Sequence, residues 1–153
     1  MIDLIIDTRE QKPLQFTDAS ISNIQHRKLD TGDYSVEGLE DKLCIERKGS
    51  IVEFYNNVAQ KRFWKEMDRM KEYKYKFLVF EFSPSLVEMF PYGSGLSKKI
   101  ISQLKITPAY LMKCIAQIQV QYGIHVIFGE SRDNLTSLIT KIMKEVVHVE
   151  SGS

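Results

Sequence analysis

The sequence predicts a single three-layer α/β domain in which helices flank a central mixed β-sheet. Short apolar runs of strand length alternate with longer stretches in which apolar residues recur at helical spacing. No linker rich in Pro or Gly, internal repeat or low-complexity segment divides the 153 residues, and this is the length of one ordinary domain. We therefore assign residues 1–150 to one domain and interpret residues 151–153 as a flexible end or a cloning remnant.

The first half of the chain is expected to form a strand, a hairpin and an interrupted helix. Residues 2–6 are expected to form a buried strand. Residues 33–37 and 43–48 have the period-2 pattern of strands and flank a turn, as the two strands of a hairpin do. Ser50 with Glu53 has the capping-box pattern of a helix start. The apolar stripe of this helix loses phase near residues 56–57, which predicts a break before residue 62.

The second half is expected to add two strands and two helices. Residues 75–82 and 124–128 have the composition of buried strands. Pro108 is placed to open a helix that ends before Gly123. The apolar stripe over residues 135–147 predicts a terminal helix with one face on the sheet.

Composition excludes several classes of protein. The 21 basic and 20 acidic residues give a net charge of +1, so any nucleic-acid-binding patch must be local. The two cysteines are far apart, which excludes a disulfide framework and a cysteine zinc site. We found neither an apolar run of membrane-spanning length nor a signal-peptide pattern, so we expect an intracellular protein that does not contact membranes.

The hairpin carries the residues with the clearest chemistry. Along strand 43–48, Glu46 and Lys48 share one face, about 7 Å apart, and the turn places Asp33 opposite Glu46 at about 5 Å. Two carboxylates at that distance can share a hard divalent cation, and a nearby ammonium can offset charge on a phosphate. Asp7 adds a third carboxylate if the first strand lies beside the hairpin.

Three motifs, in this order and spacing, resemble the ERCC4-type nuclease domain of XPF-type enzymes, within the restriction-endonuclease-like PD-(D/E)XK superfamily. The motifs are Ile6-Asp7-Thr8-Arg9-Glu10, Gly32-Asp33-Tyr34 and Ile45-Glu46-Arg47-Lys48. Arg62 and Glu66 also recur at the spacing of the next helix of that family. The resemblance implies a restriction-endonuclease-like fold and a DNA endonuclease, dependent on Mg²⁺ or Mn²⁺, that cuts flapped, forked or branched DNA near a junction between duplex and single strand.

The resemblance also implies roles for individual residues. Asp33, Glu46 and Asp7 would hold the metal, with Lys48 as the catalytic lysine. The supporting residues would be Arg9, Glu10, Arg47, Arg62 and Glu66, although strand alternation points Arg47 away from the acids. Family members carry an Asp four residues after the motif lysine, where this chain has Val52; Glu53 either replaces that Asp or only caps its helix.

Four basic residues are candidates for contact with DNA phosphates. Arg62 and Lys65 belong to the densest basic stretch, and Lys98 and Lys99 follow a glycine-containing loop. A solvated surface with charge pairs at i, i+4 spacing is the alternative for both groups.

The sequence leaves partners and activity class open. The width of the 135–147 stripe, together with the family resemblance, predicts a homodimer through the last two helices. The alternatives to an endonuclease are a non-catalytic DNA-binding or scaffold subunit and a related exonuclease or junction resolvase. The expected location is the cytoplasm of a bacterial host for a viral protein, or the nucleus for a eukaryotic one.

Overall fold

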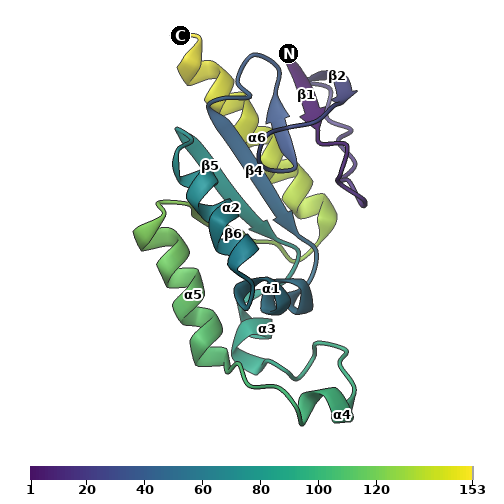
Figure 1. Ribbon diagram of the computed structural model, residues 1–153. Helices are drawn as coiled ribbons and strands as arrows, with labels where there is room; N and C mark the ends of the chain where they lie inside the picture. The colour runs from purple at the N-terminus through teal and green to yellow at the C-terminus, as the bar shows by residue number, and fades with distance from the viewer. Residues whose placement is uncertain (153) are drawn as a thin grey trace.

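The computed structural model describes residues 1–152, which form a mixed six-stranded sheet with helices on both faces (Figure 1). The strands are β1 (Ile2–Ile6), β2 (Ile21–His26), β3 (Tyr34–Val36), β4 (Leu43–Lys48), β5 (Tyr75–Phe80) and β6 (His125–Phe128). The helices are α1 (Ile51–Val58), α2 (Lys61–Lys71), α3 (Pro84–Met89), α4 (Lys98–Ile101), α5 (Pro108–Gln121) and α6 (Arg132–Glu150). Ser153, part of the predicted flexible end, lies outside the described residues.

The sheet has the order β2-β1-β3-β4-β5-β6 and combines both kinds of pairing. Strand β1 is parallel to β2 and antiparallel to β3, and β3 is antiparallel to β4. Strands β4, β5 and β6 are parallel to one another. The carboxyl ends of these three strands therefore meet at one edge, where β4 continues into α1 and β6 into α6.

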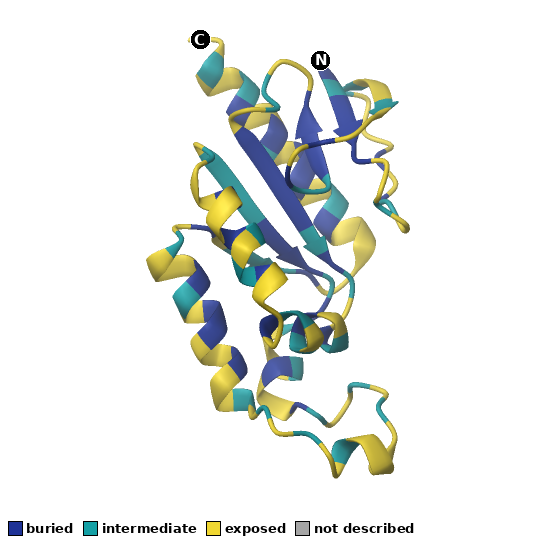
Figure 2. Cartoon of the chain, viewed as in Figure 1, coloured by how far each residue is buried: buried dark blue, intermediate teal, exposed yellow. Residues whose placement is uncertain are grey.

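Two hydrophobic clusters, one on each face of the sheet, confirm the predicted three layers. Side chains of α1, α2, α3 and α5 pack in one cluster, with Phe54, Met67 and Leu111 among its fully buried members. The other cluster joins α6 to β1, β3 and β4 through residues such as Ile139 and Met143. Figure 2 shows the central strands as the most continuously buried part of the chain.

Helix α6 differs from the expectation that its stripe serves both the sheet and a second copy. Leu135, Ile139, Met143 and Val146 are all buried in the domain's own core. Only Leu138 and Val149 remain as exposed large apolar residues of this helix. Most of the stripe is therefore buried against the sheet, and Leu138 is its one exposed large apolar residue.

The other differences from the predicted elements are local. Strand β2 and the short helices α3 and α4 were not predicted, and β5 ends at Phe80 rather than at residue 82. The predicted helix break is confirmed between α1 and α2, at residues 59–60. The predicted cap is also confirmed, since the Ser50 side chain accepts a hydrogen bond from the Glu53 N–H at 3.1 Å. Within residues 1–152, no helix combines the length and apolar character needed to cross a bilayer.

Candidate active site

A short antiparallel pairing places Asp33 opposite Glu46. Tyr34 of β3 pairs with Ile45 of β4, and the Asp33 N–H donates to the Ile45 carbonyl at 2.8 Å. The Arg47 N–H then donates to Oδ2 of Asp33 at 2.8 Å. This is the predicted register, so the carboxylate of Asp33 is held directly by the backbone of β4.

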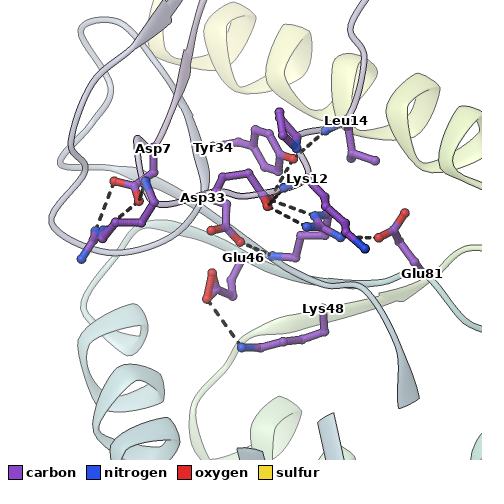
Figure 3. Close-up of polar contacts among 12 residues, drawn as sticks. Asp7, Lys12, Leu14, Asp33, Tyr34, Glu46, Lys48 and Glu81 are labelled. Atoms are coloured by element: carbon purple, nitrogen blue, oxygen red, sulfur yellow. Dashed lines mark hydrogen bonds and ion pairs between the residues drawn. The ribbon is translucent and has the colours of Figure 1, made fainter. Parts of the chain in front are cut away.

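Glu46 and Lys48 project from one face of β4 and are both buried, with exposed fractions of 7% and 8%. Lys48 Nζ lies 3.9 Å from Oε2 of Glu46 and 5.5 Å from the ring centroid of Phe63 on α2. Figure 3 shows the lysine reaching toward the glutamate, with Asp33 above them. An acid and an ammonium are thus held together beneath the protein surface.

Helix α2 brings a third carboxylate to this place. The side chains of Asp33 and Glu66 both lie close enough to Glu46 to raise the pKa of its carboxyl group. We call Asp33, Glu46 and Glu66 the acid cluster. It lines a small cavity of about 210 Å³ together with Asp7 and Arg9, among other residues. Oε1 of Glu66 is buried and has no hydrogen-bond partner in the described part of the chain.

The acid cluster is electrostatically unbalanced. Burial raises the pKa of Glu46 well above its usual range, and the negative charge of Asp33 raises it further. Burial also raises the pKa of Asp33, although hydrogen bonds from Glu46 and the Arg47 N–H oppose this shift. Ionisation of these carboxyl groups is therefore unfavourable unless a cation joins them.

The donor set of the acid cluster fits a hard divalent cation. Mg²⁺ and Mn²⁺ bind carboxylate oxygens, and the buried Glu66 oxygen without a partner is the kind of atom that a bound cation satisfies. No three Asp, Glu, His or Cys side chains among residues 1–152 form a ready-made metal-binding group. The acid cluster therefore offers the oxygen ligands that such a cation prefers, but its side chains are not arranged as a metal site among the described residues.

Asp7 lies at the end of β1 and borders the same cavity, but its oxygens are already engaged. They accept hydrogen bonds from Arg9 Nε at 2.8 Å, Arg9 Nη2 at 3.2 Å and the Leu29 N–H at 2.7 Å. Burial acts to raise the pKa of Asp7, yet these hydrogen bonds outweigh it, so the pKa lies below its usual value. In this arrangement Asp7 holds Arg9, and its role as a metal ligand stays a prediction.

The opposite face of β4 carries a second group of charges, which we call the ion-pair network. The Arg47 guanidinium binds Glu10 through Nε at 2.8 Å and Nη2 at 2.6 Å, and its Nη1 contacts Glu81. Arg132 at the start of α6 binds Glu81 at 2.8 Å and the Lys12 carbonyl at 2.8 Å. The prediction that Arg47 points away from the acid cluster is confirmed.

The pKa of Glu10 shows how completely this network is paired. Burial alone would raise that pKa, but the hydrogen bonds from Arg47 hold it below its usual value. The hydrogen bonds to Glu10 likewise raise the pKa of Arg47. Each acid of the ion-pair network is thus bound by an arginine, whereas the carboxyl groups of the acid cluster lie against one another.

A groove of about 750 Å³ passes both groups of charges. Asp33, Glu46 and Lys48 line it on one side, and residues of the ion-pair network line it on the other. Gly49 and Ser50 before α1, Glu53 in its first turn, and Glu130 and Ser131 before α6 also line the groove. The acid cluster is therefore accessible from an open surface channel at the carboxyl edge of β4, β5 and β6.

The ERCC4 domain profile matches residues 6–142, which is most of the chain and includes every residue of both groups. The chain belongs to the ERCC4 domain family. This confirms the family that the three sequence motifs indicate. A comparison with curated proteins finds no match to this chain.

The fold of this ERCC4 domain matches two solved structures of XPF from Aeropyrum pernix. One superposes with a TM-score of 0.70 at 18% identity, over 95% of this chain and 65% of that one. The other, a complex with DNA, superposes with a TM-score of 0.71 at 18% identity, over 97% of this chain and 66% of that one. The chain therefore shares the fold of these XPF structures and spans about two thirds of the length of those chains.

The residues predicted to contact DNA lie outside the groove of this ERCC4 domain. Arg62 and Lys65 are exposed on α2, and neither borders the groove or the small cavity. Arg69, on the same face of α2 as Arg62 and Glu66, does border the cavity and was not predicted. Lys98 and Lys99 lie on α4, in a separate part of the domain.

Sequence reasoning also missed Glu81 and Arg132. A usable signal existed for Glu81, because it directly follows β5, which is parallel to β4, and the ends of parallel strands share an edge. Arg132 reaches Glu81 only because of where α6 packs in the fold, and the sequence gives no sign of that position. Glu53 lines the groove, and its N–H completes the cap of α1. That Glu53 replaces the Asp that family members carry after the motif lysine stays a prediction.

Proposed function

We propose that this ERCC4 domain is a metal-dependent DNA endonuclease. The observation that carries the proposal is the pairing of the partly buried Asp33 with the buried Glu46 and Lys48, all three on a groove of about 750 Å³. Membership of the ERCC4 family supports DNA nuclease activity, and one XPF structure with this fold is a complex with DNA. The groove takes the DNA backbone, and the acid cluster lies at its inner wall.

Each residue of the centre has a defined task in this proposal. Asp33 and Glu46 would hold a Mg²⁺ or Mn²⁺ ion, with the Glu66 carboxylate on α2 as a further oxygen ligand. Such an ion would supply positive charge against the phosphodiester and would activate water. Lys48, fixed between Glu46 and Phe63, places its ammonium where negative charge develops on the phosphate. The Arg47 N–H keeps Asp33 in position.

The substrate structure that we propose is DNA with a junction between duplex and single strand. Arg62 and Lys65 on α2 are proposed phosphate contacts on the side of the acid cluster, because their helix also supplies Glu66. Both are exposed, so neither is committed to the core. We place the protein's activity inside the cell, where DNA substrates of this kind occur.

The test is a panel of labelled linear, flap, fork and four-way-junction DNAs with Mg²⁺, Mn²⁺ or EDTA. The proposal expects internal cuts near the junction in either metal and none in EDTA. Stepwise release of terminal nucleotides would instead identify an exonuclease. Symmetrical cuts confined to four-way junctions would identify a resolvase.

A non-catalytic DNA-binding subunit is the second candidate. It is favoured by the lack of a ready-made group of three metal-binding side chains among residues 1–152. That candidate expects binding to the same DNAs with no cleavage in any metal. The intact Asp33, Glu46 and Lys48 favour the enzyme, since a scaffold has no use for an acid buried against a second carboxylate at an electrostatic cost.

We further propose that the domain forms a homodimer, with its interface on α5 rather than on the α6 stripe. Tyr110, Met112 and Val120 of α5 are exposed, Val120 by 83%. Light scattering at micromolar concentration tests this, with twice the chain mass of 17.8 kDa expected. A mass equal to that of one chain would refute the dimer. Val120→Glu should dissociate the dimer without unfolding the domain, because Val120 is exposed on α5.

A further inference from the structure

The segment from α3 to β6 has a charge composition unlike the rest of the chain. Residues 89–129 contain Lys98, Lys99, Lys105 and Lys113 and no acidic residue, although the whole chain has a net charge of only +1. Elsewhere most clusters of basic residues are interspersed with acids, as on α2. This local excess of positive charge has no part in the acid cluster or the ion-pair network.

Residues 91–107, which we call the arm, connect α3 to α5 and include α4. Figure 1 shows the arm projecting beyond α1 and α3, at the end of the molecule where β4 and β5 finish. The groove opens at the carboxyl edge of the same strands. Arm and groove thus lie toward one end of the domain.

The arm has an inner face and an outer face. Leu96, Leu104 and Ile106 are partly buried and pack against the hydrophobic core, so they anchor the arm. The outer residues include Tyr92, which is 70% exposed, and Ile100, which is 45% exposed. An anchored loop that still exposes an aromatic ring presents a fixed surface rather than a loose chain.

Tyr92 is presented by an ordered turn. Its N–H donates to the Met89 carbonyl at 2.8 Å, and the next residue, Gly93, has a φ of +76° that favours glycine. No ring contact involves Tyr92 within residues 1–152, in contrast to Tyr55, Trp64 and Phe90, which all stack or pack on aromatic neighbours. The ring is therefore available for a partner.

The lysines of the arm are equally available. Lys98 and Lys99 lie in the first turn of α4 and are exposed, and Lys105 is exposed after it. None of the three makes an ion pair with the described residues, whereas Lys42, Lys48 and Lys74 do. Ammonium groups without acids nearby attract an anionic partner.

We propose that the arm binds single-stranded DNA, with Tyr92 stacking on an unpaired base and Lys98 and Lys99 contacting the flanking phosphates. Surfaces that hold unpaired DNA combine lysine charge with exposed aromatic rings, whereas a duplex keeps its bases inside and offers no face for stacking. The proposal rests on the proposed nuclease function only in naming DNA as the partner. It assigns to the arm the recognition of the unpaired strand next to the cut duplex.

Binding of a fluorescent oligo-dT and of a blunt duplex, measured by anisotropy in EDTA, tests the proposal independently of cleavage. Tyr92→Ala should weaken oligo-dT binding by at least about fivefold, the low end for loss of one stacked base. Tyr92→Phe should restore it, and duplex binding should change by less than twofold. Equal oligo-dT affinity for wild type and Tyr92→Ala, or an equal loss for both DNAs, overturns the proposal.

The charge contribution has its own matched control. The double variant Lys98→Ala/Lys99→Ala should reduce the slope of log affinity against log salt by about 1.4, at about 0.7 per phosphate of single-stranded DNA. Lys141→Ala/Lys144→Ala on α6 removes the same charge from exposed positions and should leave the slope unchanged. Equal effects of the two double variants would contradict a specific arm. Arm-dependent binding without any cleavage would support the proposed binding of single-stranded DNA by the arm and would refute only the proposed nuclease activity.

Discussion

Strand β4 separates two groups of buried acids that have opposite electrostatic environments. On one face, Glu46 lies against Asp33 and Glu66, and a single lysine ammonium stands 3.9 Å away. On the other face, Glu10 and Glu81 are bound by Arg47 and Arg132. Glu46 and Arg47 are consecutive residues of β4, yet Glu46 belongs to a group with an excess of negative charge and Arg47 to a group whose charges balance.

The difference separates a functional group of charges from a structural one. The ion-pair network joins the segment after β1, the strands β4 and β5 and the start of α6, so it stabilises the fold at the groove. The acid cluster joins β3, β4 and α2 at an electrostatic cost that a bound cation would remove. Acids whose pKa is raised by burial, rather than acids in fully matched ion pairs, are therefore the better guide to a functional site here.

Breaking the ion-pair network should have the largest effect on stability. Arg47→Ala leaves Glu10 and Glu81 buried without their shared cation, and we expect a loss of about 3–5 kcal/mol in the free energy of unfolding. Urea unfolding measures this. Arg27→Ala breaks the more exposed pair with Glu40 and should cost less than about 1 kcal/mol. Similar losses for both variants would mean that the buried network is not structural.

Adding a divalent cation should stabilise the protein through the acid cluster. Mn²⁺ at 100 times its dissociation constant should stabilise the wild type by about 2.7 kcal/mol, because it binds only the folded acid cluster. Asp33→Asn/Glu46→Gln should abolish this gain, and Glu145→Gln on the exposed side of α6 should keep it. An equal gain in the double variant would place the cation elsewhere.

The two groups should also respond oppositely to pH, as the smallest of these effects. Glu46 has a raised pKa, so its contribution to stability is present below its unfolded pKa of about 4.5 and is lost as pH rises through the folded value. Glu10 has a lowered pKa, so its contribution is present above about 4.5 and is lost as pH falls through the folded value. Metal-free protein should therefore gain stability from pH 7 to pH 5 and lose it below about pH 4.5.

Glu46→Gln isolates the first of these contributions. Its melting temperature in EDTA at pH 7 should be equal to or slightly above that of the wild type, and its stability should vary less between pH 5 and pH 7. An unchanged slope in that interval would show that the pKa of Glu46 is not raised.

The parts of the fold that local sequence patterns determine were predicted correctly. Alternation along residues 33–37 and 43–48, with a turn centred between Leu39 and Glu40, predicted the hairpin register that joins Asp33 to Glu46. Ser50 with Glu53 marked the start of α1. Strand β2 was missed because Ser22, Asn23 and Ile24 are exposed at the sheet edge and show no buried alternation. Its parallel pairing with β1 comes from tertiary structure alone.

The site was predictable where its residues share a strand pair and less so where they come from distant segments. Glu66 was expected beside the site, but its buried oxygen without a partner depends on how α2 packs over β4. Glu81 and Arg132 join Arg47 across 34 or more residues of sequence, and ion pairing at such separation leaves no periodic signal. The dimer through the last two helices stays a prediction, and the burial of Ile139 and Met143 in the domain's own core could not be seen from the width of the α6 stripe alone.

Cleavage of a labelled flap DNA by wild type and Glu46→Gln tests the central claim most directly. We predict that the wild type cuts with Mn²⁺ and stops in EDTA, that Glu145→Gln cuts at the wild-type rate, and that Glu46→Gln is slower by at least about 100-fold, since even residues that only support a metal ligand cost 10- to 100-fold. Full activity of Glu46→Gln, or equal cutting by the wild type in EDTA, would contradict the assignment of the acid cluster as the catalytic centre.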